Sequence, residues 1–192
     1  MRMLSIMAAG LVLAAPAARA ATFEIDVSHS SLGFGVKHMV VSTTRGTFAD
    51  FAGTFDFDPA DPASLSASVT IQTASVNTGN AKRDDHLRTS DFFDAQQFPQ
   101  ITFVSTRAEA TADGVVLYGN LTMRGVTKEI ALPLEITGPI TDPWQKVRVG
   151  LEGKTRINRR DWGISWSKSM DNGGLVVGDE VTLEIVVEGM QK

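Results

Sequence analysis

Cysteine is absent from the 192-residue sequence, and its absence removes several structural and chemical options. Disulfide bonds, thiol nucleophiles, thiolate metal sites and lipid attachment at an N-terminal cysteine are all excluded. The G-x-S-x-G motif of serine hydrolases and the H-E-x-x-H motif of zinc proteases are missing as well. We therefore expect a protein that is not an enzyme and whose fold is held together by packing alone.

Histidine is scarce, and its three copies have the wrong spacing for a metal site. His29 and His38 stand nine residues apart, across an expected kink at Gly33 and Gly35, and His86 is distant. No pair has the i, i+4 spacing of ligands on a helix or the i, i+2 spacing of ligands on a strand. The sequence therefore indicates neither a metal site nor a cofactor.

Long apolar runs are also missing, because the run from Leu4 to Ala15 is too short to cross a bilayer. It follows an early arginine, Arg2, and precedes Ala18-Arg19-Ala20, which has the A-x-A pattern of a cleavage site. Residues 1–20 are therefore predicted to be a secretory signal peptide that is cleaved after Ala20. This prediction places the mature protein, residues 21–192, in the periplasm as one domain.

Positive charge is in the minority. Removal of Arg2 and Arg19 with the signal peptide leaves 16 basic against 22 acidic residues and a net charge of about −6. Such a chain repels nucleic acid and anionic membrane surfaces unless it carries a local basic patch. We therefore expect no nucleic-acid partner.

The residues that are present alternate between apolar and polar over most of the chain, which is typical of β-strands with one buried face. Phe23 and Ile25, for example, alternate with Thr22 and Glu24. An apolar switch between residues 48 and 51 indicates a bulge within one long strand. The pattern predicts eight strands, over about residues 22–27, 46–57, 65–72, 100–108, 115–123, 126–136, 147–157 and 181–187.

These strands are apolar on one side only, which argues against a membrane barrel and against a parallel α/β sheet. Short turns such as Asp113-Gly114 and Arg124-Gly125 favour antiparallel neighbours. The fold class is therefore all-β. Eight antiparallel strands fit either a closed barrel or a two-sheet sandwich.

The interior of such a fold would be hydrocarbon, so a ligand inside it would have to be mostly hydrocarbon too. An eight-stranded barrel can also be filled by its own side chains, and the sequence leaves both alternatives open. The inward residues expected to contact a ligand are Phe34, Val36, Phe55, Val69, Ile71, Phe103, Leu117, Leu132, Val149, Leu151, Leu183 and Ile185.

One long stretch, residues 75–103, interrupts the strand pattern. Asn80 is suited to cap a short helix that begins at Ala81. Leu87, Phe92 and Phe93 then need an apolar surface to cover. The stretch is therefore predicted to be a helical cap over one end of the barrel, between the third and fourth strands.

A scattered polar set is the candidate for binding a headgroup at the mouth of the barrel, since arginine binds phosphate through paired hydrogen bonds. The alternative is that the same residues form ion pairs and helix caps, with Arg83 or Arg159 paired to Asp84, Asp91 or Asp161. The set comprises His29, His38, Arg83, Asp84, His86, Asn158, Arg159 and Trp162.

Several segments together resemble the YceI-like family of exported lipid-binding proteins. They are DVSHSSLGFGVKHM (26–39), RGTF (45–48), RDDHLRTSDFFDAQQFP (83–99), ITFVST (101–106), GNLTMRGVTKEI (119–130) and INRRDWGI (157–164). The resemblance implies a lipocalin-like antiparallel barrel that holds a polyisoprenoid chain.

The function expected from these observations is the transport, storage or sequestration of a long isoprenoid, which could be a polyprenyl chain, a quinone-like lipid or a prenyl phosphate. The alternative is a ligand-free interaction or scaffold protein with a filled core. Transient contact with a partner at the inner membrane fits either function. The sequence leaves open both the identity of the lipid and the choice between monomer and homodimer.

Overall fold

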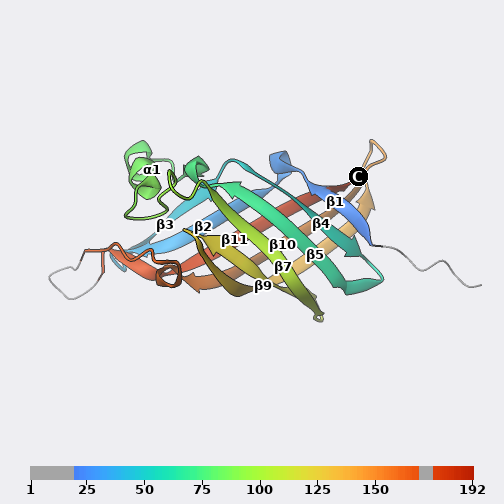
Figure 1. The fold of residues 1–192 in the computed structure, drawn as a ribbon. Helices are drawn as coiled ribbons and strands as arrows, with labels where there is room; N and C mark the ends of the chain where they lie inside the picture. The colour runs from blue at the N-terminus through green and yellow to red at the C-terminus, as the bar shows by residue number, and fades with distance from the viewer. Residues whose placement is uncertain (1–19, 169–174) are drawn as a thin grey trace, which may run out of the picture.

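The computed structural model describes residues 20–168 and 175–192, and this part of the chain is all-β apart from one short α-helix (Figure 1). The helix, α1, spans Ala81–Arg88, and short 3-10 turns occupy Val27–His29 (η1), Thr73–Ser75 (η2) and Arg159–Trp162 (η3). The strands are β1 (Ala21–Ile25), β2 (Ser31–His38), β3 (Ser42–Phe48), β4 (Phe51–Asp58), β5 (Asp61–Gln72), β6 (Val76–Asn77), β7 (Gln100–Ala110), β8 (Gly114–Met123), β9 (Val126–Thr141), β10 (Val147–Asn158) and β11 (Val177–Gln191).

Eight of these strands form a closed barrel. Hydrogen bonding follows the order β1–β4–β5–β7–β8–β9–β10–β11, and β11 pairs with β1 to complete the ring. Every pair in the ring is antiparallel. The predicted eight-stranded antiparallel barrel is therefore confirmed, and its helix lies between the third and fourth barrel strands in chain order, β5 and β7.

The alternation in the sequence explains which side chains face inward. In β8 every second residue is buried, namely Val115, Leu117, Gly119, Leu121 and Met123, and the residues between them are more exposed. Successive side chains of a strand point to opposite faces, so the buried set faces the barrel interior. Hydrophobic burial of this set holds the strand in its register.

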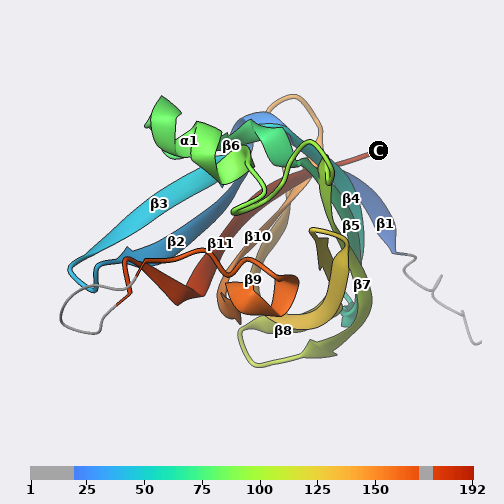
Figure 2. The same cartoon turned by 60° about the vertical axis from the view of Figure 1, so that its left-hand side comes forward.

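In two places around the barrel wall, two short strands follow one another end to end, β1 with β2 and β4 with β3. β11 pairs with β1 through residues 189–191 and with β2 through residues 177–186, so β1 and β2 follow one another along β11 with η1 between them. β4 then pairs with β1, and β3 pairs with β2. The strands β2, β3 and β6 extend the wall at the end of the barrel that carries α1 (Figure 2).

The prediction of one long strand over residues 46–57 is wrong, because β3 ends at Phe48 and β4 begins at Phe51. Between them, the Ala49 N–H donates to the Ser75 carbonyl (3.1 Å) and the Asp50 carbonyl accepts from the Gln72 N–H (2.8 Å). These two hydrogen bonds take the place of strand-to-strand bonds between β3, which pairs with β2, and β4, which pairs with β1. The apolar switch in the sequence therefore marks a break between two strands and not a bulge within one.

The expected kink at Gly33 and Gly35 is also wrong. β2 pairs with β3 without interruption, and the two glycines lie opposite Thr47 and Arg45. Glycine in the outward positions of β2 hides the apolar-polar alternation, which explains why this strand escaped the sequence pattern.

The segment from α1 to β7 covers one end of the barrel, as predicted (Figure 2). The Asn80 side chain accepts a hydrogen bond from the Arg83 N–H (3.1 Å) and so caps α1 as expected. Phe92 is buried, and Leu87 and Phe93 are half-buried against the core. These three apolar contacts stabilise a helix that would be too short to form alone.

The opposite end of the barrel is filled. The Phe23 and Phe55 rings stack there with centroids 5.1 Å apart, and Leu65 and Val149 are almost completely buried. Gly189 lies beside this stack, where a Cβ would collide with the Phe55 ring. The packed core therefore occupies the half of the barrel that is remote from α1.

Within the described residues, no helix is both long enough and apolar enough to span a membrane. The predicted signal peptide lies outside the described residues except for Ala20, so the leader and its cleavage after Ala20 stay predictions.

Candidate functional site

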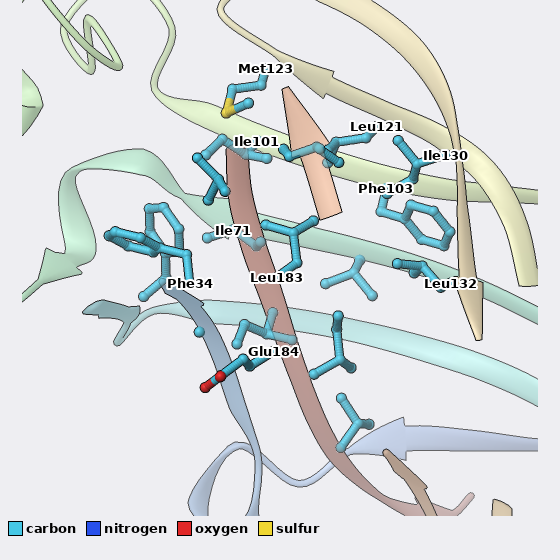
Figure 3. A pocket seen from close by; sticks show the side chains of 18 of the residues that line it. Phe34, Ile71, Ile101, Phe103, Leu121, Met123, Ile130, Leu132, Leu183 and Glu184 are labelled. Carbon is cyan, nitrogen blue, oxygen red and sulfur yellow. The ribbon is translucent and has the colours of Figure 1, made fainter. Parts of the chain in front are cut away.

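The inward-facing side chains line a cavity of about 210 Å³ (Figure 3), and Leu87, Phe92 and Phe93 of the cap are part of its lining. A single water molecule needs roughly 10–15 Å³ of such space, so the cavity is far larger than an ordinary packing void. The alternative of a completely filled barrel is therefore wrong for this part of the molecule.

The lining of the cavity is almost entirely hydrocarbon. Among the lining side chains of the described residues, only Thr54, Arg159 and Glu184 carry oxygen or nitrogen. The Glu184 carboxylate lies 3.4 Å from Lys154 Nζ, and the residues on either side of it on β11, Leu183 and Ile185, belong to the inward face. The cavity therefore offers a ligand dispersion contacts and burial from water, with few hydrogen bonds.

Eleven of the twelve residues expected to contact a ligand line this cavity. They are Phe34, Val36, Phe55, Val69, Ile71, Phe103, Leu117, Leu132, Leu151, Leu183 and Ile185. Val149 does not line it, because this residue is buried to 1% exposure in the filled half. The inward face alone does not decide whether a residue meets a neighbour or an empty space.

Several further lining residues were not among the expected contacts. Leu121, Met123, Ile130 and Leu134 occupy the same faces of β8 and β9 as Leu117 and Leu132, so the alternation could have found them. A second group comes from the cap, from β2 and β3, whose bounds the sequence pattern did not predict, and from residues outside the strands. It includes Leu32, Phe48, Leu87, Phe92, Phe93 and Ile164.

Aromatic contacts join the cap to the wall. The Phe93 ring packs edge-on against Phe48, with centroids 5.6 Å apart, and against Phe34, with centroids 6.4 Å apart. Phe34 and Phe48 also contact each other at 5.8 Å. Because these residues come from the cap, β2 and β3, the cluster closes the barrel interior beneath α1.

His86 fixes the other side of the cap. Its ring lies edge-on against Phe92 and Trp166, with centroids 5.1 and 4.9 Å away, and its Nε2 lies 2.8 Å from Asp91 Oδ2. His86 is not among the residues that line the cavity. Its contacts are those of a residue that connects the cap to the segment after η3.

Arg159 is the one member of the predicted headgroup set that lines the cavity. It is 4% exposed, and it donates to the carbonyls of Ile164, Val177 and Gly178 and to the Asp179 carboxylate (3.1 Å). Burial lowers the pKa of the Arg159 guanidinium, and Asp179 opposes that shift. Four of its five N–H groups are thus engaged within the described residues, which leaves little capacity for a ligand.

The other members of the headgroup set near the cap have structural contacts. Arg83 donates to the Thr78 hydroxyl and carbonyl, and Asp84 accepts from the Thr78 N–H and hydroxyl. Asn158 caps η3, and the Trp162 indole N–H donates to the Leu121 carbonyl. His38 lies at the end of β2 opposite Ser42, so no cluster of headgroup ligands forms.

The partners proposed for the arginines were wrong. Arg159 pairs with Asp179 and not with Asp161, and Arg83 binds Thr78 and no carboxylate of the described residues. Asp91 pairs with His86 instead. The alternative of a capping and ion-pair network describes most of the set, although its individual pairs differ.

A separate polar cluster centres on Arg148. This guanidinium contacts the carboxylates of Asp142 (2.7 Å), Asp26 (2.9 Å) and Glu188. Hydrogen bonds from Ser28, His29 and Arg148 lower the pKa of Asp26, and those from Arg148 and the Lys146 N–H lower the pKa of Asp142. The cluster ties the β9–β10 loop to η1 and β11.

Asp26, His29 and Glu188 bring together ligand atoms that could surround a metal ion. Arg148 already donates to both carboxylates, so a metal ion would have to displace a cation from them. His29 therefore belongs to this ion-pair cluster, on a different part of the molecule from the cap.

Comparison with known proteins gives a consistent result. The model of a family described as the YceI-like domain matches residues 23–189. The protein YceI of Escherichia coli is 39% identical over 192 residues, which cover 99% of this chain and 97% of that protein. The crystal structure of BcnA from Burkholderia cenocepacia has a TM-score of 0.74 at 28% identity and covers 85% of this chain and 98% of BcnA.

A polyisoprenoid binding domain from Saccharophagus degradans has the same fold, with a TM-score of 0.67 at 17% identity, and covers 91% of this chain and 100% of that domain.

Proposed function

The chain belongs to the YceI-like family, and on that basis we propose that it is an exported carrier that holds one long isoprenoid chain in its apolar cavity. Its barrel is built to bind an apolar ligand. The proposal adds the class of ligand, the role of carrier and the location in the periplasm. The location rests on the apolar run and the A-x-A pattern of residues 1–20.

The observation that carries the proposal is the hydrocarbon lining of the cavity. Each CH₂ group that leaves water for such a lining contributes about 0.8 kcal/mol, so affinity grows with the length of apolar chain that is buried. A sugar or a nucleotide would leave its polar groups without partners in the same space, at about 1–3 kcal/mol for each group. The ligand is therefore mostly hydrocarbon.

An isoprenoid is the preferred class among hydrocarbon ligands because the Saccharophagus degradans domain, which shares the barrel, is a polyisoprenoid binding domain. The cavity counts against the scaffold alternative, which required a filled core. A headgroup would remain near the cap, because the stacked Phe23 and Phe55 rings fill the opposite end of the barrel.

Native mass spectrometry of the purified protein, followed by organic extraction, tests the proposal. We expect a bound lipid with the mass of a polyprenyl compound, and we expect added prenyl lipid to raise the unfolding midpoint. Ligand at one hundred times its Kd stabilises by about 2.7 kcal/mol. A saturated fatty acid with a similar number of carbons is the control for chain chemistry. A protein that carries no lipid and gains no stability from prenyl lipid would overturn the proposal.

A further inference from the structure

The turn between β2 and β3 exposes three consecutive apolar side chains, and we call residues 39–41 the hairpin tip. Met39 is 41% exposed, Val40 74% and Val41 87%. Single exposed apolar residues are common on protein surfaces, but a contiguous group at the end of a projecting hairpin is not. Val40 and Val41 contribute little burial to the described fold, so their apolar character needs another reason.

The backbone of the tip is unfavourable for the residues that occupy it. Met39 and Val40 have φ of 49° and 63°, and the Val41 N–H donates to the His38 carbonyl (3.1 Å). A turn with positive φ at both central residues is normally built from Asn-Gly or a similar pair. A β-branched residue such as valine is a clear outlier in this region. Local structure therefore favours polar residues or glycine at the tip, and the chain has methionine and valine instead.

The hairpin carries only positive charge although the whole chain is acidic, and the acidic residues of the neighbouring strand, Asp179 and Glu180, are paired with Arg159, Arg160 and Arg156. The stretch from β2 through β3 contains Lys37 and Arg45, both exposed, and no aspartate or glutamate. Lys168 is nearby, because its carbonyl accepts from the Val176 N–H, and the Val176 carbonyl accepts from the Met39 N–H. Lysine and arginine beside exposed apolar groups are the combination that attaches proteins to anionic lipid surfaces.

The tip is also close to the cavity in the fold. Val36 and Val177 line the cavity, and Val177 pairs with His38, the residue before the tip. The hairpin lies at the end of the barrel that carries α1 (Figures 1 and 2). A membrane in contact with the tip would thus face the cap and the hollow half of the barrel.

We propose that the hairpin tip inserts Val40 and Val41 into the interfacial region of an anionic membrane, with Lys37 and Arg45 at the lipid headgroups. The purpose of this contact, transfer of an isoprenoid between the membrane and the cavity, rests on the proposed function. The contact itself does not, because it follows from the exposure, backbone and charge of the tip.

Co-sedimentation with vesicles of phosphatidylcholine and phosphatidylglycerol tests the contact. We expect the protein to bind these vesicles and to bind less as salt is raised, since salt screens the basic residues. The double substitution Val40→Asn with Val41→Ser should weaken binding by about tenfold or more, because it removes apolar groups from the interface. Asparagine tolerates positive φ, so this variant should keep its fold.

Two exposed apolar residues elsewhere provide matched controls. Val104 on β7 is 51% exposed, and Trp144 on the β9–β10 loop is 77% exposed at the opposite end of the barrel. Val104→Ser and Trp144→Ser should leave vesicle binding unchanged. Because the chain has no cysteine, an environment-sensitive dye on Val41→Cys should shift to the blue with vesicles, and one on Val104→Cys should not.

The proposal is overturned if the protein does not bind anionic vesicles, if the tip variant binds as well as the parent, or if Trp144→Ser is the variant that loses binding. Analytical ultracentrifugation adds one more decisive outcome. A dimer that the tip substitutions dissociate, with vesicle binding unchanged, would assign the tip to a second copy of the chain. Native mass spectrometry of the same samples separates the two proposals, because lipid-free protein that still binds vesicles would refute only the carrier function.

Discussion

The division of the barrel into a hollow half and a filled half predicts opposite effects for the same substitution. Val69 on β5 lines the cavity, and Val149 on β10 is buried to 1% exposure in the packed half. Val69→Trp adds an indole to empty space, and Val149→Trp forces one into a site that is already full. Leu183→Trp, from the opposite wall of the cavity, should behave like Val69→Trp.

The expected magnitudes follow from the space available. The ring atoms added at Val69 need roughly half of the 210 Å³ cavity if each is comparable in size with a water molecule. The substitution should then change the free energy of unfolding by less than about 1 kcal/mol and abolish most of the binding of prenyl lipid. Overpacking at Val149 should destabilise the protein by about 1–3 kcal/mol, which lowers the unfolding midpoint by roughly 2–12 °C in a domain of this size.

Urea unfolding and lipid binding by native mass spectrometry, measured on the same preparations, provide the two readings. Val104→Trp on the outer face of β7 controls for the general effect of an added indole. The reasoning is refuted if Val69→Trp destabilises as much as Val149→Trp, or if it binds lipid as well as the parent protein.

Three further predictions concern the cap, the acidic cluster and the tip. Leu87→Ala with Phe92→Ala should speed hydrogen exchange of α1 and lipid release more than exchange of β11, because local opening needs less free energy than unfolding; equal acceleration of both segments would identify a purely structural plug. The pKa values of Asp26 and Asp142 are lower in the folded than in the unfolded state, so their stabilisation is complete above about pH 4 and is lost as the pH falls through the folded values; urea unfolding between neutral and acid pH should show this decline, and a flat profile would contradict it. Val40→Asn alone should raise the free energy of unfolding by about 1 kcal/mol, because asparagine relieves the positive-φ backbone; a lower unfolding midpoint would count against the strain.

Local patterning accounts for most of the barrel. The apolar-polar alternation identified β8 correctly because all five of its inward residues are buried in the barrel interior. It underestimated β9, which continues to Thr141, because the residues beyond Ile136 are exposed. It also underestimated β11, which spans Val177–Gln191, because the buried residue after Val187 on the inward face is Gly189, which gives no apolar signal. Strand ends depend on neighbours that are remote in the sequence.

The break between β3 and β4 illustrates the same limit. Ala49 and Asp50 stop the ladder because their backbone groups bond to Ser75 and Gln72, some 25 residues along the chain. Arg159 likewise pairs with Asp179, 20 residues along the chain, and not with the nearby Asp161. A sequence identifies groups that need partners, but the fold chooses among the candidates.

The location of the cavity was the least predictable feature. Val69 and Val149 are both inward-facing valines, so the apolar-polar alternation treats them alike. In the structure Val69 lines the cavity, and Val149 lies in the half that the stacked Phe23 and Phe55 rings help to fill. That stack also limits a ligand, because an apolar chain in the cavity can extend only as far as Phe55. In the proposed function, the hydrocarbon end of the isoprenoid would therefore point toward the stack and its headgroup would lie toward the cap. The hairpin tip lies at the same end of the barrel as the cap, so a membrane bound at the tip would face the end at which this headgroup lies.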